Sequence, residues 1–169
     1  MKNNFCNIAV KNIYTKPNIR SEVSTQILYG ERFKILGEKK NWLKIKTDFD
    51  NYTGFIKKQK FLNQFNPLFK IFKPKSRIFI KKKNKFSPSK NFLYFASGIS
   101  VLNKNKDYLE FEKNRWIKKK DTKAINHYEK NYLKIFKLFL NSKYLWGGKT
   151  VNGIDCSALI QIYFYYNRI

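Results

Sequence analysis

The sequence predicts an α+β protein in which small β domains come first and helices come last. Three observations support this class. Short apolar segments separated by turn residues fill positions 5–62, and a less regular run of such segments follows at 63–120. From Asp121 onward, apolar residues recur at intervals of three and four, as on one face of a helix. We therefore expect three units, at residues 1–62, 63–120 and 121–169.

The first unit has the pattern of a small barrel or sandwich. Pro17 lies in a polar segment after the first strand, where its fixed φ favours a turn. Trp42–Lys46 alternates apolar and polar side chains, which is typical of a strand with one buried face. Several short strands in so few residues indicate a closed or two-layered β fold. We expect strands at residues 8–10, 24–29, 33–36, 42–46 and 52–56.

The second unit, residues 63–120, is harder to interpret. It begins with a basic run punctuated by prolines, Phe69–Pro88, to which we assign no strand. Its last segment, Arg115–Ile117, echoes the Gly54–Ile56 strand of the first unit. A second, degenerate barrel and an irregular β-rich linker both fit this pattern. The expected strands are residues 92–95, 100–102, 108–111 and 115–117.

The third unit is expected to be helical at its start. Apolar residues at helical spacing predict an amphipathic helix beginning at Asp121 or Thr122, either of which suits an N-cap. Ser157–Asn167 lacks Gly and Pro and is also rich in large apolar residues, so a buried helix or a strand fits it. If this segment is a helix, one shared face consists of Leu159, Ile160, Tyr163, Phe164 and Asn167.

The chain is strongly basic, with 36 Lys and Arg against 11 Asp and Glu and a net charge of +25. Such a charge favours polyanions. The excess is lysine, however, beside many residues with AT-rich codons, so codon bias explains it better than selection for phosphate contacts. Nucleic acid binding through Lys70–Lys85, where Phe72, Phe79 and Phe86 interleave with basic residues, is therefore the weakest of three functional hypotheses.

Other features exclude some classes of protein. Cys6 and Cys156 do not form a disulfide framework, and their spacing is not that of a metal site, so we expect no metal and no cofactor. No stretch of eighteen apolar residues predicts a membrane span. The start of the chain lacks the apolar core and cleavage site of a signal peptide, so for the sequence as given we expect a cytoplasmic location.

The residues around Cys156 carry the clearest chemical signal. Gly147-Gly148 and Gly153 permit tight turns before it. If a helix starts here, Cys156 lies in its first turn, where free amide groups and the helix dipole stabilise a thiolate, the species that attacks a carbonyl. A lone cysteine is more often a small buried apolar residue. The residues around Cys156 are therefore needed to distinguish a reactive thiol from a small buried apolar residue.

That segment closely resembles the signature of the NlpC-type cell-wall cysteine peptidases, which have a papain-like fold. The residues in register are Tyr144, Trp146, Gly147, Gly148, Gly153, Asp155, Cys156, Ser157, Leu159 and Gln161. Residues 26–31, 42–46 and 50–56 resemble, in the same order, a bacterial Src-homology-3-like barrel of the kind that precedes cell-wall hydrolases. The expected architecture is one or two such barrels followed by the N-terminal part of a papain-like domain.

The resemblance implies a role for each matching residue. Cys156 becomes the nucleophile, and its backbone N–H serves the oxyanion. Tyr144 provides a hydroxyl beside it that positions substrate or polarises the carbonyl, although a core tyrosine is an equal alternative. Asp155 and Ser157 shape the turn and the substrate-binding cleft, and simple helix-capping roles for both are the favoured interpretation.

The resemblance is incomplete in one respect that matters for activity. The family's base is a histidine well downstream of the cysteine, whereas the one histidine of this chain, His127, precedes it. We expect His127 to face solvent on a helix. The chain therefore looks like a truncated catalytic domain, inactive alone, whose uncovered terminal helix exposes Tyr163, Phe164 and Tyr166 for association or aggregation. Ala158 also replaces the family's usual glycine.

The leading hypothesis is thus a hydrolase of peptidoglycan stem peptides, typically of the γ-D-glutamyl–diamino-acid bond. The alternative is a non-catalytic module that binds cell-wall material through its barrels. The implied partners are peptidoglycan or murein peptides, with nucleic acid unlikely. Such a substrate implies the periplasm or cell envelope, or recycled wall fragments in the cytoplasm.

Overall fold

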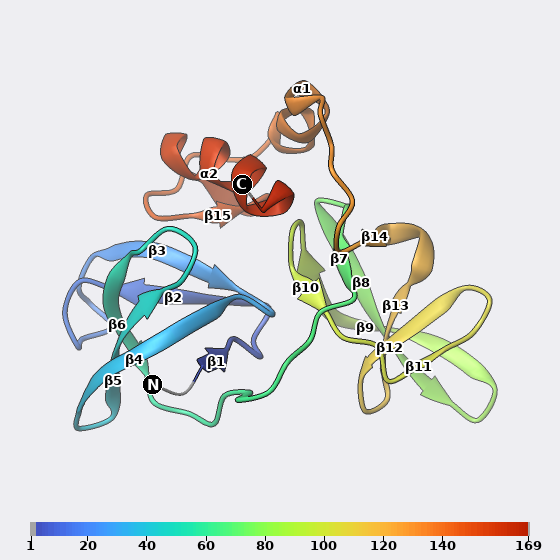
Figure 1. Ribbon diagram of the computed structural model, residues 1–169, viewed down its shortest axis with the longest axis horizontal. Coiled ribbons are helices and arrows are strands. Elements are labelled where there is room, and N and C mark those ends of the chain that lie inside the picture. Colours follow the sequence, from blue (N-terminus) through green and yellow to red (C-terminus); the bar gives the residue numbers. More distant parts are fainter. Residues whose placement is uncertain (1–2, 169) are drawn as a thin grey trace.

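The computed structural model describes residues 3–168, which form two β units side by side with a helical segment lying across them (Figure 1). The chain is mostly β, with 45% strand and 14% helix, so it contains less helix than the predicted α+β class implies. A connection without regular structure, apart from a β-bridge between Phe5 and Leu62, runs from the first unit to the second.

The first unit is one six-stranded antiparallel sheet in the order β1-β4-β5-β6-β2-β3. Its core consists of side chains from alternate positions of these strands, among them Ile13, Phe33 and Ile45, all fully buried. The strands are β1 (Asn3–Phe5), β2 (Val10–Tyr14), β3 (Val23–Leu28), β4 (Arg32–Lys39), β5 (Trp42–Thr47) and β6 (Thr53–Lys57).

Four of the predicted strands match observed strands in this unit, and one does not. The alternation in Trp42–Lys46 is confirmed, because Leu43 and Ile45 are buried while Lys44 between them is exposed. The predicted first strand at residues 8–10 is wrong: the strand begins at Val10 and pairs with β3 as far as Tyr14. Polar side chains at Lys11 and Asn12 obscured this strand in the sequence.

The second unit contains two sheets around its own core. A five-stranded sheet has the order β11-β12-β13-β8-β9, and a three-stranded sheet has the order β10-β7-β14. The core consists of Ile71, Ile78, Leu93, Ile99, Leu109, Phe111 and Ile117, joined by Tyr29 of the first unit. The strands are β7 (Phe69–Ile71), β8 (Lys75–Lys82), β9 (Lys85–Tyr94), β10 (Gly98–Ile99), β11 (Asn103–Lys104), β12 (Tyr108–Glu112), β13 (Arg115–Lys118) and β14 (Thr122–Ala124).

The prediction from sequence underestimated the number of residues in strands in this unit. The basic run at 69–88, to which no strand was assigned, forms β7, β8 and the start of β9. The strand predicted at 100–102 is absent, since β10 ends at Ile99 and β11 begins at Asn103. The first error arises because lysines on the exposed side of β8 and β9 hide the alternation.

The helix predicted to start at Asp121 is also wrong. Asp121 ends a 3₁₀ turn, η1 (Lys119–Asp121), and its buried carboxylate accepts a hydrogen bond from Ser76 Oγ at 2.7 Å. β14 follows at once and pairs with β7. These long-range contacts outweigh the local helical periodicity. A short helix, α1 (Tyr132–Phe136), starts eleven residues after Asp121 with Asn131 as its N-cap, and η2 (Lys137–Phe139) continues it.

The last elements are a small hairpin, β15 (Lys149–Thr150) and β16 (Gly153–Ile154), and a helix, α2 (Cys156–Asn167). α2 buries Ala158, Ile162 and Tyr166, which follow one another at intervals of four. The face that the sequence analysis grouped, with Ile160 and Phe164, is not the buried one, because these residues are 55% and 40% exposed.

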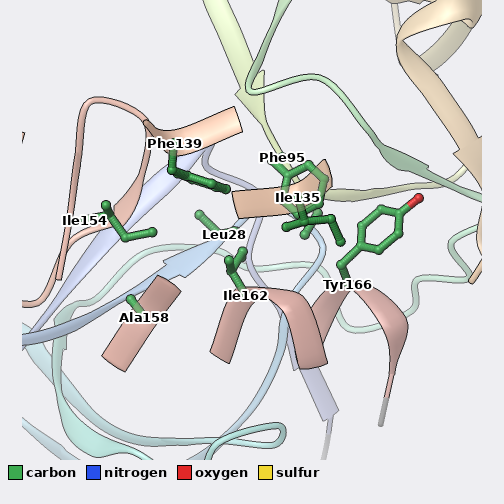
Figure 2. Close-up of a cluster of buried hydrophobic side chains, with 9 residues drawn as sticks. Leu28, Phe95, Ile135, Phe139, Ile154, Ala158, Ile162 and Tyr166 are labelled. Atoms are coloured by element: carbon green, nitrogen blue, oxygen red, sulfur yellow. The ribbon is translucent and has the colours of Figure 1, made fainter. Parts of the chain in front are cut away.

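The core beneath α2 is shared between all three parts of the chain (Figure 2). Leu28 enters from β3, Phe95 comes from the segment after β9, and Ile135 comes from α1. The rings of Phe95 and Tyr166 stack with centroids 4.8 Å apart. The helical segment therefore has no separate core of its own but uses apolar side chains of both β units.

Candidate functional site

Cys156 is the first residue of α2, and its side chain is exposed. The first amide groups of a helix lack intrahelical acceptors and point toward the N-terminus. Asp155 precedes the helix in an extended conformation, and its Oδ1 accepts hydrogen bonds from Ala158 N at 2.7 Å and from Ser157 Oγ at 2.8 Å. Cys156 thus lies at a capped helix N-terminus that is open to solvent.

The other oxygen of Asp155 fixes the glycine turn that precedes the helix. Oδ2 accepts from Gly147 N at 3.0 Å, while Asp155 N donates to Gly148 O at 3.2 Å. Gly147 has φ +68°, and a Cβ there would lie 2.6 Å from Val23 O of β3. The glycine is therefore required both by its conformation and by its close approach to the first unit. Asp155 holds the turn and the helix together.

Lys149 anchors this segment in the first β unit through a buried cluster of charges. Its Nζ lies 2.9 Å from Asp50 Oδ2 and 3.4 Å from Glu31 Oε1. The side chains of Lys149 and Glu31 are 1% exposed, and that of Asp50 is 5% exposed. The two carboxylates come from the turns after β3 and β5, so a single ammonium group joins three separate parts of the chain.

The pKa values in this cluster reflect burial and mutual attraction. Burial alone would lower the pKa of Lys149, but Glu31 and Asp50 together raise it. Burial raises the pKa of Glu31, and Lys149 only partly offsets this. For Asp50, burial is outweighed by Lys149 and by hydrogen bonds, which lower its pKa. Lys149 is therefore protonated at neutral pH, and Glu31 binds a proton more readily than Asp50 does.

Both β units also contact the hairpin that leads to Cys156. From the first unit, Gln26 Oε1 accepts from Lys149 N at 2.9 Å. From the second, Tyr94 OH accepts from Asn152 Nδ2 at 2.6 Å. The segment before the thiol is thus held on two sides. These contacts could not be predicted from the sequence, because Gln26 and Tyr94 lie far from the hairpin along the chain and no pattern links them to it.

Tyr144 lies beside the site, and its side chain is 66% exposed. It forms a parallel bridge with Ile154, two residues before Cys156. The alternative of a core tyrosine is therefore wrong. Other large apolar residues in this part of the chain are exposed as well, and we call this set the exposed apolar residues. The set consists of Leu140, Tyr144, Leu145, Trp146, Ile160 and Phe164.

His127 does not lie near the thiol. It is half-buried in the loop between β14 and α1, not on a helix, and its Nδ1 lies 2.8 Å from the hydroxyl of Tyr166. Tyr166 is ten residues beyond Cys156, roughly 15 Å along the axis of α2. Burial, with Lys123 and Lys70 adding to it, lowers the pKa of His127. The imidazole therefore packs at the opposite end of the helix from the thiol.

The expected uncovered face of α2 is only partly as predicted. Phe164 is exposed, but Tyr166 is 1% exposed because it packs against Phe95. Within residues 3–168, no group of three or more His, Cys, Asp or Glu side chains is placed to hold a metal ion. No helix in the same part of the chain is long and apolar enough to cross a membrane.

Comparisons with known proteins bear on the fold. Residues 13–61 match the family model of the bacterial dipeptidyl-peptidase Sh3 domain. A crystal structure of an NlpC/P60 family protein from Bacillus cereus is similar over 99% of this chain and 73% of that one, with a TM-score of 0.77 and 15% identity. The likeness shows the fold. Among curated proteins, none matches the sequence.

Two more distant solved structures are NlpC2 and NlpC1 from Trichomonas vaginalis. They are each 14% identical to this chain, with TM-scores of 0.35 and 0.33. The matches cover 97% and 98% of this chain but only 65% and 62% of those chains.

Proposed function

We propose that Cys156 is the nucleophile of a cysteine peptidase site that cleaves amide bonds in peptidoglycan stem peptides, the γ-D-glutamyl–diamino-acid bond in particular. The observation that carries this proposal is an exposed thiol on the first residue of a capped helix. Free amide groups at a helix N-terminus attract anions. The fold shared with an NlpC/P60 protein supports the assignment. Its substrate would place the protein in the cell envelope or among recycled wall fragments.

The neighbouring residues have distinct roles in this proposal. Attack by the thiolate forms a tetrahedral oxyanion, to which the backbone N–H of Cys156 donates. Tyr144, whose side chain is largely free of packing, contacts the substrate from the same face. Asp155 positions the thiol by fixing the helix cap and the glycine turn, and Ser157, which donates to Asp155, borders the cleft.

A base is the missing part of the site. The one imidazole of the sequence lies at the other end of α2, bonded to Tyr166. Without a base, proton transfer to and from the reacting groups is lost, which costs roughly 10²–10⁴-fold in rate. We therefore propose that these 169 residues by themselves hydrolyse stem peptides very slowly, and that the exposed apolar residues associate with other polypeptide.

Alkylation with iodoacetamide tests the nucleophile, because the chain contains its own control. Cys6 is fully buried, and burial raises its pKa to about 12. The native protein should therefore react at one thiol, Cys156, and faster than a cysteine in an unstructured peptide. The Cys156→Ala variant should react only when unfolded. A native Cys156 that reacts no faster than the peptide thiol refutes the proposal.

A non-catalytic cell-wall-binding module is the second candidate, favoured by the match of residues 13–61 to a bacterial Sh3 domain. Incubation with purified peptidoglycan separates the two functions. Release of muropeptides by the wild-type chain but not by Cys156→Ala supports an enzyme and contradicts our expectation of very slow hydrolysis. Equal binding by both chains, with no release by either and an unreactive thiol, supports a module.

A further inference from the structure

A hollow of about 490 Å³ at one end of the second β unit is lined mainly by lysines. One wall is the turn between β11 and β12, and the other is the end of β13 with η1. Figure 1 shows β11 and β12 at the end of this unit that is remote from α2. The residues that line this lysine pocket are Lys106, Asp107, Tyr108, Lys118, Lys119 and Lys120.

Backbone and side-chain hydrogen bonds hold the two walls in place. Asn105 Oδ1 accepts from Asp107 N at 2.9 Å and from Tyr108 N at 2.8 Å, which fixes the turn. Lys119 N donates to Asp107 O at 2.7 Å, and Tyr108 pairs with Lys118 across the strands. The lysines are therefore brought together by rigid backbone, so that binding an anion requires little reorganisation.

The positive charge of the lysine pocket is not neutralised within the protein. Among residues 3–168, none of its four lysines forms an ion pair. The other acidic side chains of this unit are already engaged: Glu110 accepts from Asn114 N, Glu112 pairs with Arg115, and Asp121 pairs with Lys73. Of the acidic residues in the described part of the chain, Asp107 alone lines the pocket.

The distribution of charge along the chain also singles out this unit. Residues 69–124 contain 17 Lys and Arg against 4 Asp and Glu, a net +13 of the total +25 in one third of the sequence. A codon bias acting on the whole gene would spread the excess evenly. The concentration of charge therefore favours a function located in the second unit.

We propose that the lysine pocket binds a flexible polymer of phosphate groups without bases, such as a polyol phosphate chain. Lysine lacks the bidentate geometry that favours arginine at phosphate, but its ammonium group binds phosphate as a point charge, which suffices for a flexible chain. Nucleic acid fits less well, because single strands need free aromatic faces for stacking. Here Phe86 already stacks on Tyr108 at 4.1 Å, and Lys118 lies 5.3 Å from the Phe79 ring centroid. This inference does not depend on the role of Cys156.

The full-length chain can be titrated with poly(glycerol phosphate) at several NaCl concentrations. Four phosphate contacts predict a slope of about −3 in log affinity against log salt, at roughly 0.7 for each contact on a flexible strand. Replacing the four pocket lysines by Gln should bring this slope close to zero and weaken binding about tenfold or more at low salt. The pocket variant is K106Q/K118Q/K119Q/K120Q.

A control variant with the same loss of charge separates the pocket from the net charge of the protein. Four exposed lysines of the first unit form no ion pair with any described residue and suit this purpose, as K16Q/K34Q/K39Q/K44Q. The control should keep most of the affinity, and circular dichroism should show both variants folded. Equal losses in the two variants, tighter binding of oligothymidylate with the same number of phosphates, or no binding by the wild-type chain each overturn the proposal.

Discussion

Replacing Lys149 by Met tests how the segment before Cys156 is held in place. The substitution keeps the length and apolar stem of the side chain but removes the one cation between Glu31 and Asp50. Both carboxylates would remain buried, with exposed fractions of 1% and 5%. Removing one partner of a buried ion pair costs about 3–5 kcal/mol. In a protein of this size, that loss lowers the melting temperature by roughly 6–20 °C.

Urea unfolding at neutral pH measures this loss against a matched control. Lys134 pairs with Glu129 at 2.7 Å, but its side chain is 55% exposed. K134M should therefore cost about 1 kcal/mol or less. The triple variant E31Q/D50N/K149M removes all three charges and should recover most of the stability lost in K149M. A loss in K149M no larger than that in K134M would refute the reasoning.

The pH dependence gives a second readout of the same cluster. Without Lys149, burial leaves the folded-state pKa of Glu31 well above its unfolded value. Because the folded state of the variant then binds a proton more tightly than the unfolded state, the variant gains stability as the pH falls toward the pKa of the unfolded carboxyl group. The difference between K149M and wild type should therefore shrink between pH 7 and pH 5, by about 1.4 kcal/mol for each unit of pKa shift.

Three further predictions concern α2. Asp155→Ala removes acceptors from two amides and should cost about 1–3 kcal/mol in urea unfolding, whereas Asp155→Asn should cost less. Burial, with Arg168, lowers the pKa of Lys70 to about 8; the wild type should therefore gain stability relative to Lys70→Met as the pH rises from 8 to 10. Phe164→Ser should reduce concentration-dependent self-association in sedimentation velocity without changing the alkylation rate of Cys156.

The sequence predicted best where local pattern and burial agree. In β5 the alternation of Leu43, Lys44 and Ile45 is typical of a strand with one buried face. The segment before Cys156 combines turn glycines with an aspartate that suits a helix cap. The residues that follow fit a helix or a strand, and the structure shows a helix that begins at Cys156. The role of the thiol comes from the resemblance.

Prediction failed where distant residues decide the structure. Asp121 looks like a helix cap until Ser76 and Lys73 are placed beside it. The buried face of α2 could not be chosen from sequence, because large apolar residues occur on every side of that helix, and only Leu28 and Phe95 select Ala158, Ile162 and Tyr166. Lys149 looks like any surface lysine before Glu31 and Asp50 surround it.

The shared core beneath α2 has a consequence for protein engineering. A segment that packs on Leu28 of one β unit and Phe95 of the other is not a transferable cassette. Chimeras that move residues 125–168 onto unrelated barrels would leave Ile162 and Tyr166 without complementary surfaces. A useful chimera must therefore take its junction upstream of β1, or must transfer Leu28 and Phe95 together with the segment.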